Sequence, residues 1–375
     1  MKTIVKYFLL LFIPLHSFAQ NGITSSKKWY IKPAFNWGFI IQHRLAIGDL
    51  IQGWIPMTEI NIVKPTDGSK LWHLENNKPD VGITVNCIGY RNPDVLGQCF
   101  AIAPFAEIPL NEKEKKTRCY MRLAWGAAYL TKCFNADDNH KNVAIGSHLN
   151  AFVGFRWNWQ INLNERLRIE PGISATHVSN GRGKVPNLGL NTIALNLGVN
   201  YKLVNTEDKV SKVDSNTVAP SKHDIVIWYS YGFNETGNPG GPKYSAHTLS
   251  FNYYFNKRNT NKIGVGVDTY YEELYLNDFA EKNITPTTAE KFRYGVKFAY
   301  AYNIGRISLP IEWGYYVGAK ISPEGPFFHR LGVRYTGKYG LVLQFGLKTH
   351  FGVAYHFDYG IGYRFSMGKK NVVKD

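Results

Sequence analysis

After its first residues, the sequence has no apolar run close to the roughly 20 residues that a membrane-spanning helix needs. Cysteines are few, four in 375 residues, and acids (28) are outnumbered by lysine and arginine (44). The missing apolar run excludes a helical anchor in the body of the chain. The formal net charge of +16 would ordinarily point to a nucleic-acid partner. The N-terminus argues against that interpretation.

Residues 1–19 have the form of a secretory signal peptide. Lys2 and Lys6 supply its positive end, residues 7–14 its apolar core, and residues 17–19 a small-x-small cleavage site. Cleavage would lower the net charge to +14, because the segment contains two lysines and no acid. We therefore expect export and no nucleic-acid partner. Two classes remain, a soluble secreted β-protein and a transmembrane β-barrel.

The cysteines lie close together, between residues 87 and 133. An even number in an exported chain permits two disulfides with three possible connectivities, so we expect them to link loops or neighbouring strands. They do not form a Cys-x-x-Cys pair, and no metal site is predicted. The cysteines are Cys87, Cys99, Cys119 and Cys133.

Alternation of side-chain type favours the membrane barrel. Between residues 149 and 163 the odd positions are apolar, and the even positions are polar or glycine apart from Phe152. Residues 249–255, 309–317, 341–347 and 355–365 repeat this pattern. Strands of a barrel in lipid must alternate in this way, with apolar side chains outward and polar side chains inward. A soluble β-sandwich also alternates, but its outer faces would carry more charge and its strands would be shorter.

We predict an all-β, antiparallel transmembrane β-barrel of about 12–16 strands, formed by residues 20–365 as one domain. Residues 205–223 are expected to form a polar loop and residues 366–375 a basic tail. The predicted location is the cell outer membrane. Candidate strands cover residues 30–40, 56–64, 80–89, 97–109, 118–130, 147–161, 165–179, 190–204, 224–236, 244–257, 262–274, 291–304, 307–318, 327–336, 339–350 and 353–366.

One predicted hairpin carries three polar residues on its apolar face. His177 and Ser179 continue the apolar row of the strand that contains Ile169 and Ile173, and Asn191 begins the apolar row of the next strand. A loop centred near residue 184 would place His177 directly opposite Asn191. Serine could then act as nucleophile, histidine as base, and asparagine as the group that orients the histidine. Short His-x-Ser patterns are common and mostly structural, but unpaired polar groups on a lipid-facing wall are costly.

The loop between these strands supplies candidates for binding substrate. Asn180 and nearby backbone N–H groups could stabilise an oxyanion, and Gly181 would allow a close approach of the backbone. Arg182 and Lys184 suit lipid phosphates, although both could equally be solvated turn residues. Asn187 is either a further substrate-binding residue or an ordinary turn residue.

These residues also resemble a known family. The pattern His177-x-Ser179-Asn180, followed by Pro-Asn-Leu-Gly at 186–189, is similar to the signature of the outer-membrane lipid A 3-O-deacylase family. This resemblance implies a β-barrel that removes an acyl chain from lipid A with a serine, a histidine and a glutamate. Asn191 stands at the glutamate position, so the chain departs from the family there. The family's barrels are small, with eight strands, and this chain is long for them.

The same hairpin is similar to that of outer-membrane phospholipase A, whose asparagine matches Asn191. That family uses calcium, yet no carboxylate occurs between Ser179 and Asn191, and calcium ligands cannot be assigned. We therefore expect no cofactor for a deacylase, and calcium only for a phospholipase. Both alternatives make the chain a carboxylic ester hydrolase whose partner is a membrane lipid.

Two functions without catalysis stay open. One is a channel or structural outer-membrane barrel, which predicts solute passage. The other is a soluble secreted protein that binds glycans through aromatic side chains, since the sequence is rich in tyrosine (24) and phenylalanine (22). The sequence makes no prediction of the oligomeric state.

Overall fold

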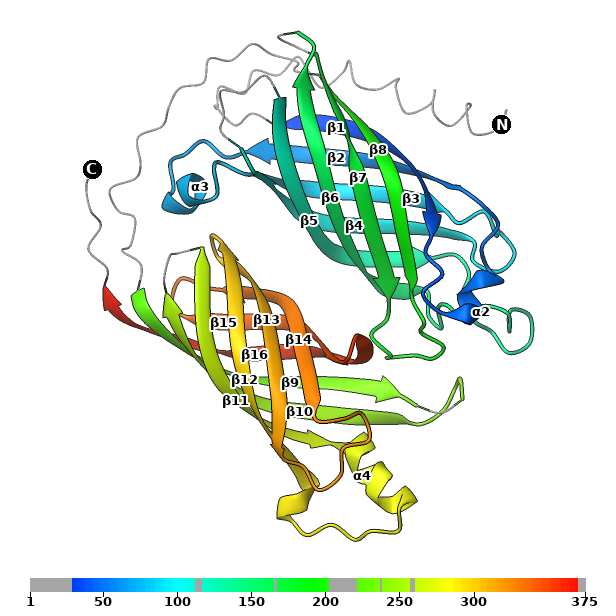
Figure 1. Ribbon diagram of the computed structural model, residues 1–375, viewed down its shortest axis with the longest axis vertical. Coiled ribbons are helices and arrows are strands. Elements are labelled where there is room, and N and C mark those ends of the chain that lie inside the picture. Colours follow the sequence, from blue (N-terminus) through cyan, green and yellow to red (C-terminus); the bar gives the residue numbers. More distant parts are fainter. Residues whose placement is uncertain are drawn as a thin grey trace.

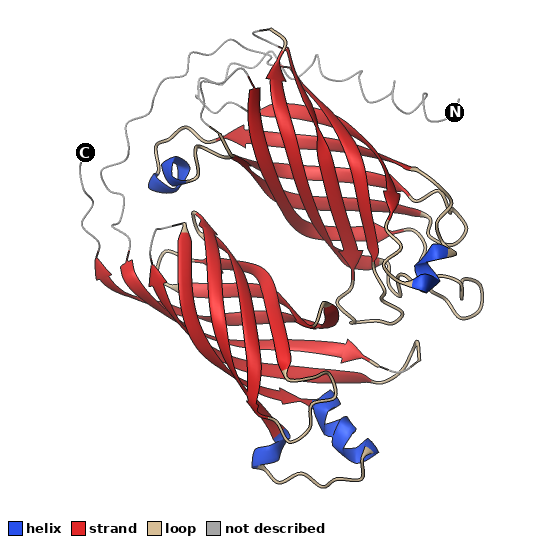
Figure 2. Ribbon diagram, in the orientation of Figure 1, coloured by secondary structure: helices blue, strands red, loops and turns tan. Residues whose placement is uncertain are grey.

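The computed structural model describes residues 29–111, 117–164, 167–201, 221–236, 238–256 and 260–369. Within these ranges the chain forms sixteen β-strands and four short helices (Figure 2). The first eight strands are β1 (Tyr30–Ile40), β2 (Ile55–Pro65), β3 (Asp80–Gly89), β4 (Gln98–Pro109), β5 (Thr117–Leu130), β6 (Leu149–Asn162), β7 (Leu167–Ser179) and β8 (Leu190–Tyr201).

The second eight strands follow after residue 220. They are β9 (Ser221–Glu235), β10 (Lys243–Asn256), β11 (Asn261–Glu272), β12 (Phe292–Ile304), β13 (Ile307–Gly318), β14 (Phe327–Thr336), β15 (Leu341–His350) and β16 (Val353–Lys369). Each of the sixteen predicted strands is present, and its described ends lie within three residues of the prediction.

The strands close into two antiparallel barrels (Figure 1). In barrel 1, β1 pairs with β8, from Ala34 opposite Gly198 to Ile40 opposite Thr192. In barrel 2, β9 pairs with β16 from Phe233 opposite Phe357. The all-β barrel class is confirmed, but the prediction of one barrel is wrong: closure occurs twice, after eight strands each time.

Both barrels have apolar outer walls and charged interiors. Outward residues such as Leu195 are 64% exposed, whereas inward Lys32 is buried and binds Glu107 at 2.6 Å and Glu170 at 3.1 Å. Side chains fill the interior of an eight-stranded barrel. The polar hollow inside barrel 1 measures only about 30 Å³, room for about one water molecule. In barrel 1, buried ion pairs therefore occupy interior space that the channel alternative assigns to water.

The connections differ in length between the two ends of each barrel. Odd-numbered strands finish at what we call the long-loop end, whose connections include residues 41–54, 131–148 and 273–291. The opposite end has connections as short as residues 305–306 and 337–340. There are two exceptions to this difference: residues 66–79 form a long connection at the opposite end, and residues 351–352 form a short one at the long-loop end. The long-loop end carries α2 (Leu45–Gly48), α4 (Glu273–Glu281) and the 3-10 helix η1 (Ala289–Lys291), and the opposite end carries α3 (Leu71–Glu75).

Several predictions at the edges of the strands need correction. Residues 221–223 belong to β9 rather than to the polar loop, and residues 366–369 belong to β16 rather than to the tail. The signal peptide, residues 205–220 and residues 370–375 lie outside the described residues. No helix in the described part of the chain is long and apolar enough to cross a membrane.

The predicted disulfides are absent. All four cysteines, each within the described ranges, carry free thiols. Cys87 and Cys99 lie on neighbouring strands, but Cys99 is buried with the inward residues whereas Cys87 shares the outward face with Val85. Side chains on opposite faces of a sheet cannot be linked without moving the backbone.

Candidate active site

The hairpin of β7 and β8 brings the predicted residues together at the long-loop end of barrel 1. His177 lies directly opposite Asn191 in the strand register, as the sequence predicted. Both side chains share the outward face of Ile173 and Ile193, which are 49% and 38% exposed. The three polar residues therefore share the outward face of the barrel, where His177 and Asn191 are half-buried and Ser179 is buried, with 2% of its surface exposed.

A chain of hydrogen bonds connects these residues. Ser179 Oγ lies 2.8 Å from His177 Nε2, and His177 Nδ1 lies 2.6 Å from Asn191 Oδ1. An amide oxygen only accepts, so Nδ1 carries the imidazole proton and Nε2 is free to accept the proton of Ser179. His177 thus has the tautomer that a general base for Ser179 needs.

His43 extends this chain and was missed by the sequence analysis. Its Nδ1 lies 3.1 Å from Asn191 Nδ2, and its Nε2 lies 2.9 Å from the carbonyl oxygen of Leu188. With a proton on Nε2, His43 donates to Leu188 and accepts from Asn191. Residues 41–54 interrupt the strand alternation, so the sequence pattern contained no signal for this contact.

Asn180 organises the loop instead of offering free donors to an oxyanion. Its backbone N–H donates to Asn187 Oδ1 at 2.9 Å, and its side-chain amide donates to the Lys184 carbonyl at 2.8 Å and to Ser147 Oγ at 2.9 Å. The substrate-binding roles predicted for Asn180 and Asn187 stay predictions, and the amide group of Asn180 already donates within the loop. Ser147, from the β5–β6 connection, was not predicted.

Glycines shape the loop at two points. Gly181 and Arg182 both have positive φ, of 63° and 68°, which turns the chain sharply directly after Ser179 and Asn180. Among the hydrogen bonds of the described residues, none uses the backbone N–H of Gly181, and Gly181 itself is buried against the ring of Phe357. Gly189, at φ 80°, lies against the imidazole, and a Cβ there would be 3.0 Å from His177 Cε1.

The basic residues of the loop differ in exposure. Arg182 is half-buried, whereas Lys184 is exposed. Their predicted contact with lipid phosphate stays a prediction. No group of three or more histidine, cysteine, aspartate or glutamate side chains in the described ranges is arranged to hold a metal ion.

Barrel 2 contacts the same loop. The backbone N–H of Glu235 donates to the Arg182 carbonyl at 2.9 Å, and the rings of Phe357 and Phe233 lie against Gly181 and Gly183. Phe357 and Phe233 come from the outer wall of barrel 2, on paired positions of β16 and β9. Residues of both barrels therefore hold the loop between β7 and β8, residues 180–189, in place.

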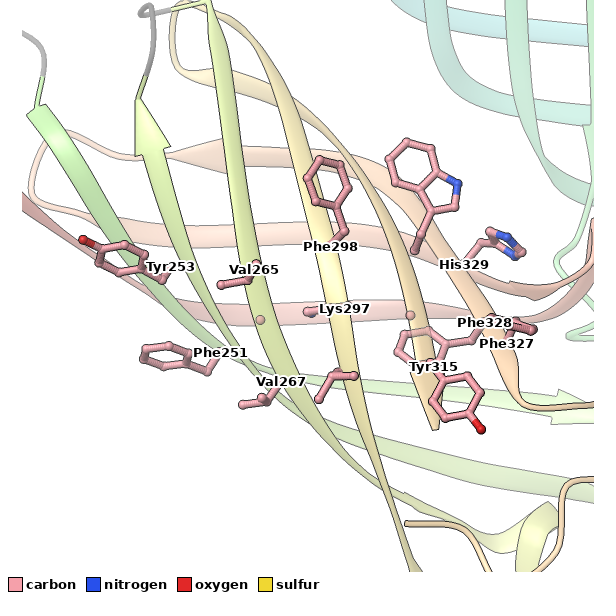
Figure 3. Close-up of a pocket in the computed structure, with 14 residues that line it drawn as sticks. Phe251, Tyr253, Val265, Val267, Lys297, Phe298, Tyr315, Phe327, Phe328 and His329 are labelled. Carbon is pink, nitrogen blue, oxygen red and sulfur yellow. The ribbon is translucent and has the colours of Figure 1, made fainter. Parts of the chain in front are cut away.

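A separate hollow of about 750 Å³ lies on the outer wall of barrel 2 (Figure 3). Outward residues of β10 to β14, including Phe251, Val265 and Tyr315, line it. His177, Ser179 and Asn191 do not contribute. Its apolar lining is what a lipid-facing wall requires, and we assign it no site.

Comparison with known proteins gives two family matches. The family described as Lipid A 3-O-deacylase (PagL) matches residues 66–200, which belong to barrel 1. The family described as Acyloxyacyl hydrolase, C-terminal domain, matches residues 223–367 of barrel 2. The two matches together cover most of the chain.

Among solved structures, the chain is similar to Neisserial surface protein A (13% identity, TM-score 0.29), covering 48% of this chain and 100% of that one. It is also similar to the KdgM porin (8% identity, TM-score 0.19), covering 71% of this chain and 93% of that one. No curated protein matches it.

Proposed function

Because the chain belongs to the lipid A 3-O-deacylase family, we propose that it removes an acyl chain from lipid A by hydrolysing an ester at Ser179. Membership makes it an outer-membrane hydrolase with a lipid substrate. The ester chemistry and the assignment to His177, Ser179 and Asn191 are our proposal. The observation that carries it is the hydrogen-bonded chain of these residues on a lipid-facing wall.

The first half of the reaction forms an acyl-enzyme. Ser179 Oγ attacks the ester carbonyl carbon while its proton passes to His177 Nε2, 2.8 Å away. Negative charge develops on the carbonyl oxygen, and the backbone N–H of Gly181 is the donor that we assign to it. The bond between the acyl carbon and the sugar oxygen then breaks, and the sugar oxygen takes the proton from His177.

The second half releases the fatty acid. Water attacks the acyl carbon of the acyl-serine and gives a proton to His177 Nε2, which returns it to Ser179 Oγ. Throughout, Asn191 Oδ1 accepts from His177 Nδ1 and keeps the ring in the productive tautomer. One ester and one water yield one acid and one alcohol.

The position of the hairpin suits this substrate. Outer-membrane barrels have long loops outside the cell and short turns on the periplasmic side. The site lies at the long-loop end, where lipid A in the outer leaflet would reach it laterally from the membrane. Arg182 and Lys184 at the same end provide cations for its phosphates.

A second candidate is phospholipase A activity, and Asn191 is the specific observation that favours it. An asparagine occupies this position in the phospholipases that the hairpin resembles, whereas the deacylases have a glutamate. The reaction steps would be the same, with a glycerol oxygen as the leaving group. The difference lies in the lipid that is bound.

Mass spectrometry of lipids incubated with the purified full-length protein separates these alternatives. Loss of one acyl chain from lipid A, greatly reduced in Ser179→Ala, is the expected result. Appearance of lysophospholipid with intact lipid A would assign a phospholipase instead. Equal hydrolysis by a folded Ser179→Ala protein would overturn the mechanism, and heat-modifiable migration in electrophoresis reports whether the barrels are folded.

A further inference from the structure

Barrel 2 carries a second serine–histidine pair on its outer wall. Ser245 and His247 are two residues apart on β10, in the same alternating row as Leu249 and Phe251, which are 57% and 37% exposed. Both side chains therefore project toward the outside of the barrel. Ser245 Oγ lies 3.3 Å from His247 Nε2. This separation is long for a hydroxyl hydrogen bond, but such contacts commonly tighten only when substrate is bound.

Tyr229 orients the histidine from the neighbouring strand. Its hydroxyl oxygen lies 2.6 Å from His247 Nδ1. When Nδ1 donates to this oxygen, Nε2 is unprotonated and faces Ser245. The arrangement of nucleophile, base and orienting oxygen is thus the one formed in barrel 1 by Ser179, His177 and Asn191.

The two pairs lie at the same end of their barrels. Ser179 is the last residue of β7, and Ser245 is the third residue of β10. Odd strands end and even strands begin at the long-loop end, so both serines lie at that end. A lipid leaflet in contact with one pair would therefore also be in contact with the other.

The surroundings of the second pair are aromatic, with one anchoring carboxylate. His247 lies directly opposite Tyr231 and Tyr271, with ring centroids 5.3 Å and 6.1 Å away. The backbone N–H of Ser245 donates to Glu273 Oε2 at 2.7 Å, which ties the serine to the start of α4. Such contacts hold the pair in place on an otherwise apolar wall.

We propose that Ser245, His247 and Tyr229 form a second hydrolytic site, which cleaves acyl esters of membrane lipids. Ser245 Oγ bonds to the acyl carbon as its proton passes to His247 Nε2, and the lipid alcohol leaves with that proton. Water then attacks the acyl-serine, its proton returns through His247 to Ser245, and a fatty acid is released. This site does not depend on the function proposed for Ser179.

The test uses a long-chain alkyl fluorophosphonate, from which an activated serine displaces fluoride. Full-length Ser179→Ala protein in detergent micelles is treated with the probe, and the modified peptides are mapped by mass spectrometry. We expect the probe on Ser245. His247→Ala in the same background should slow labelling by roughly 100-fold or more, the usual contribution of a general base.

Two further variants separate catalysis from packing. Tyr229→Phe removes the acceptor of His247 Nδ1 and should shift half-maximal labelling to lower pH, because the imidazolium loses a stabilising partner. His223→Ala is the matched control, since His223 Nδ1 also contacts a tyrosine hydroxyl, that of Tyr253 at 3.0 Å. It should leave labelling of Ser245 unchanged.

Absence of the probe from Ser245 in the folded Ser179→Ala protein would overturn the second site, whatever is found at Ser179. Equal labelling with and without His247 would do the same. Failure of the function proposed for Ser179 would appear separately, as lipid A that the wild-type and Ser179→Ala proteins either leave unaltered or deacylate equally.

Discussion

Asn191 supplies an orienting group without adding a negative charge to a lipid-facing wall, where charge is costly. An amide has two different ends, however, and only its oxygen can accept from His177. The contact from Asn191 Nδ2 to His43 Nδ1 determines which end faces which ring. We therefore treat His43 as a positioning residue that acts through Asn191.

Replacing His43 by alanine should lower kcat by roughly tenfold at most, the effect of losing one hydrogen bond of 0.5–1.5 kcal/mol, and should leave KM unchanged. His43→Gln should recover most of the loss, because its amide oxygen can accept from Asn191. The measurement is initial-rate kinetics of acyl release. His148→Ala is the control, since His148 contacts the Leu130 carbonyl. A change in KM with an unchanged kcat would contradict the positioning role.

Gly189→Ala should reduce acyl release by roughly tenfold, because the imidazole must shift by a few tenths of an ångström and catalytic groups need close placement. The added Cβ would lie 3.0 Å from His177 Cε1, so the ring must move. Gly53→Ala is the matched control: Gly53 also has a positive φ, of 98°, but nothing lies within 4 Å of its Cβ position. If both variants lose activity equally, backbone strain rather than contact with the ring is responsible.

The sequence was sufficient to bring His177, Ser179 and Asn191 together, because alternation and hairpin register determine which strand residues are neighbours. It was insufficient for His43, which reaches the site from a connection without periodicity. It also gave no signal for the contacts of Asn180 with Ser147 and Lys184, because these depend on how two loops fold against each other.

At the level of elements, the strands were predictable and the helices were not. Alternation reports a strand directly, but α2, α3 and α4 are too short to show a helical period. The predicted strand 262–274 extended into α4, which begins at Glu273. The hydroxyl of Tyr275 in α4 accepts from the backbone N–H of Lys320 at 3.0 Å, so a distant loop helps to hold the helix.

The helix α4 should become less stable as pH rises from about 4 to about 6. Partial burial, with the nearby charges of Glu324 and Glu281, raises the pKa of Asp278 from 3.8 to about 6. The folded state thus holds this proton more tightly than the unfolded state, and ionisation between these values disfavours the fold. Asp278→Asn should remove the dependence, measured as hydrogen-exchange protection of α4.

Asp137→Asn, which changes an exposed loop of barrel 1, is the control and should leave protection of α4 unchanged. Protection that increases between pH 4 and pH 6, or an unaltered profile in Asp278→Asn, would contradict the assignment to Asp278.

For the whole molecule, alternation does not report where a sheet closes. Strands of both barrels share the alternation, and it resumes unchanged in β9 after the polar stretch. Closure depends on pairing between β1 and β8 and between β9 and β16, which are far apart in the chain. In the sequence, only the polar stretch at residues 205–223 indicated the boundary between the two barrels. Its length did not distinguish a loop within one barrel from a linker between two.

The contact of barrel 2 with the loop of the proposed active site predicts that the two barrels work as a unit. Phe357 lies against Gly181, next to the loop's oxyanion donor candidate, and Glu235 holds the Arg182 carbonyl. Phe357→Ala should lower the turnover of lipid A by roughly fivefold to tenfold, because removing the ring frees a loop whose geometry the transition state requires. Turnover is measured by mass spectrometry of released acyl chains.

Phe365→Ala is the matched control, since Phe365 is an outward aromatic residue on the same strand and is 50% exposed. An equal fall in both variants would point to a general weakening of β16 or of its lipid contact. Wild-type turnover in a folded Phe357→Ala protein would mean that barrel 1 positions the loop without help. A fall confined to Phe357→Ala means that the second barrel is part of the active-site support, which would explain why one chain carries two barrels where the hydrolysis needs the residues of one.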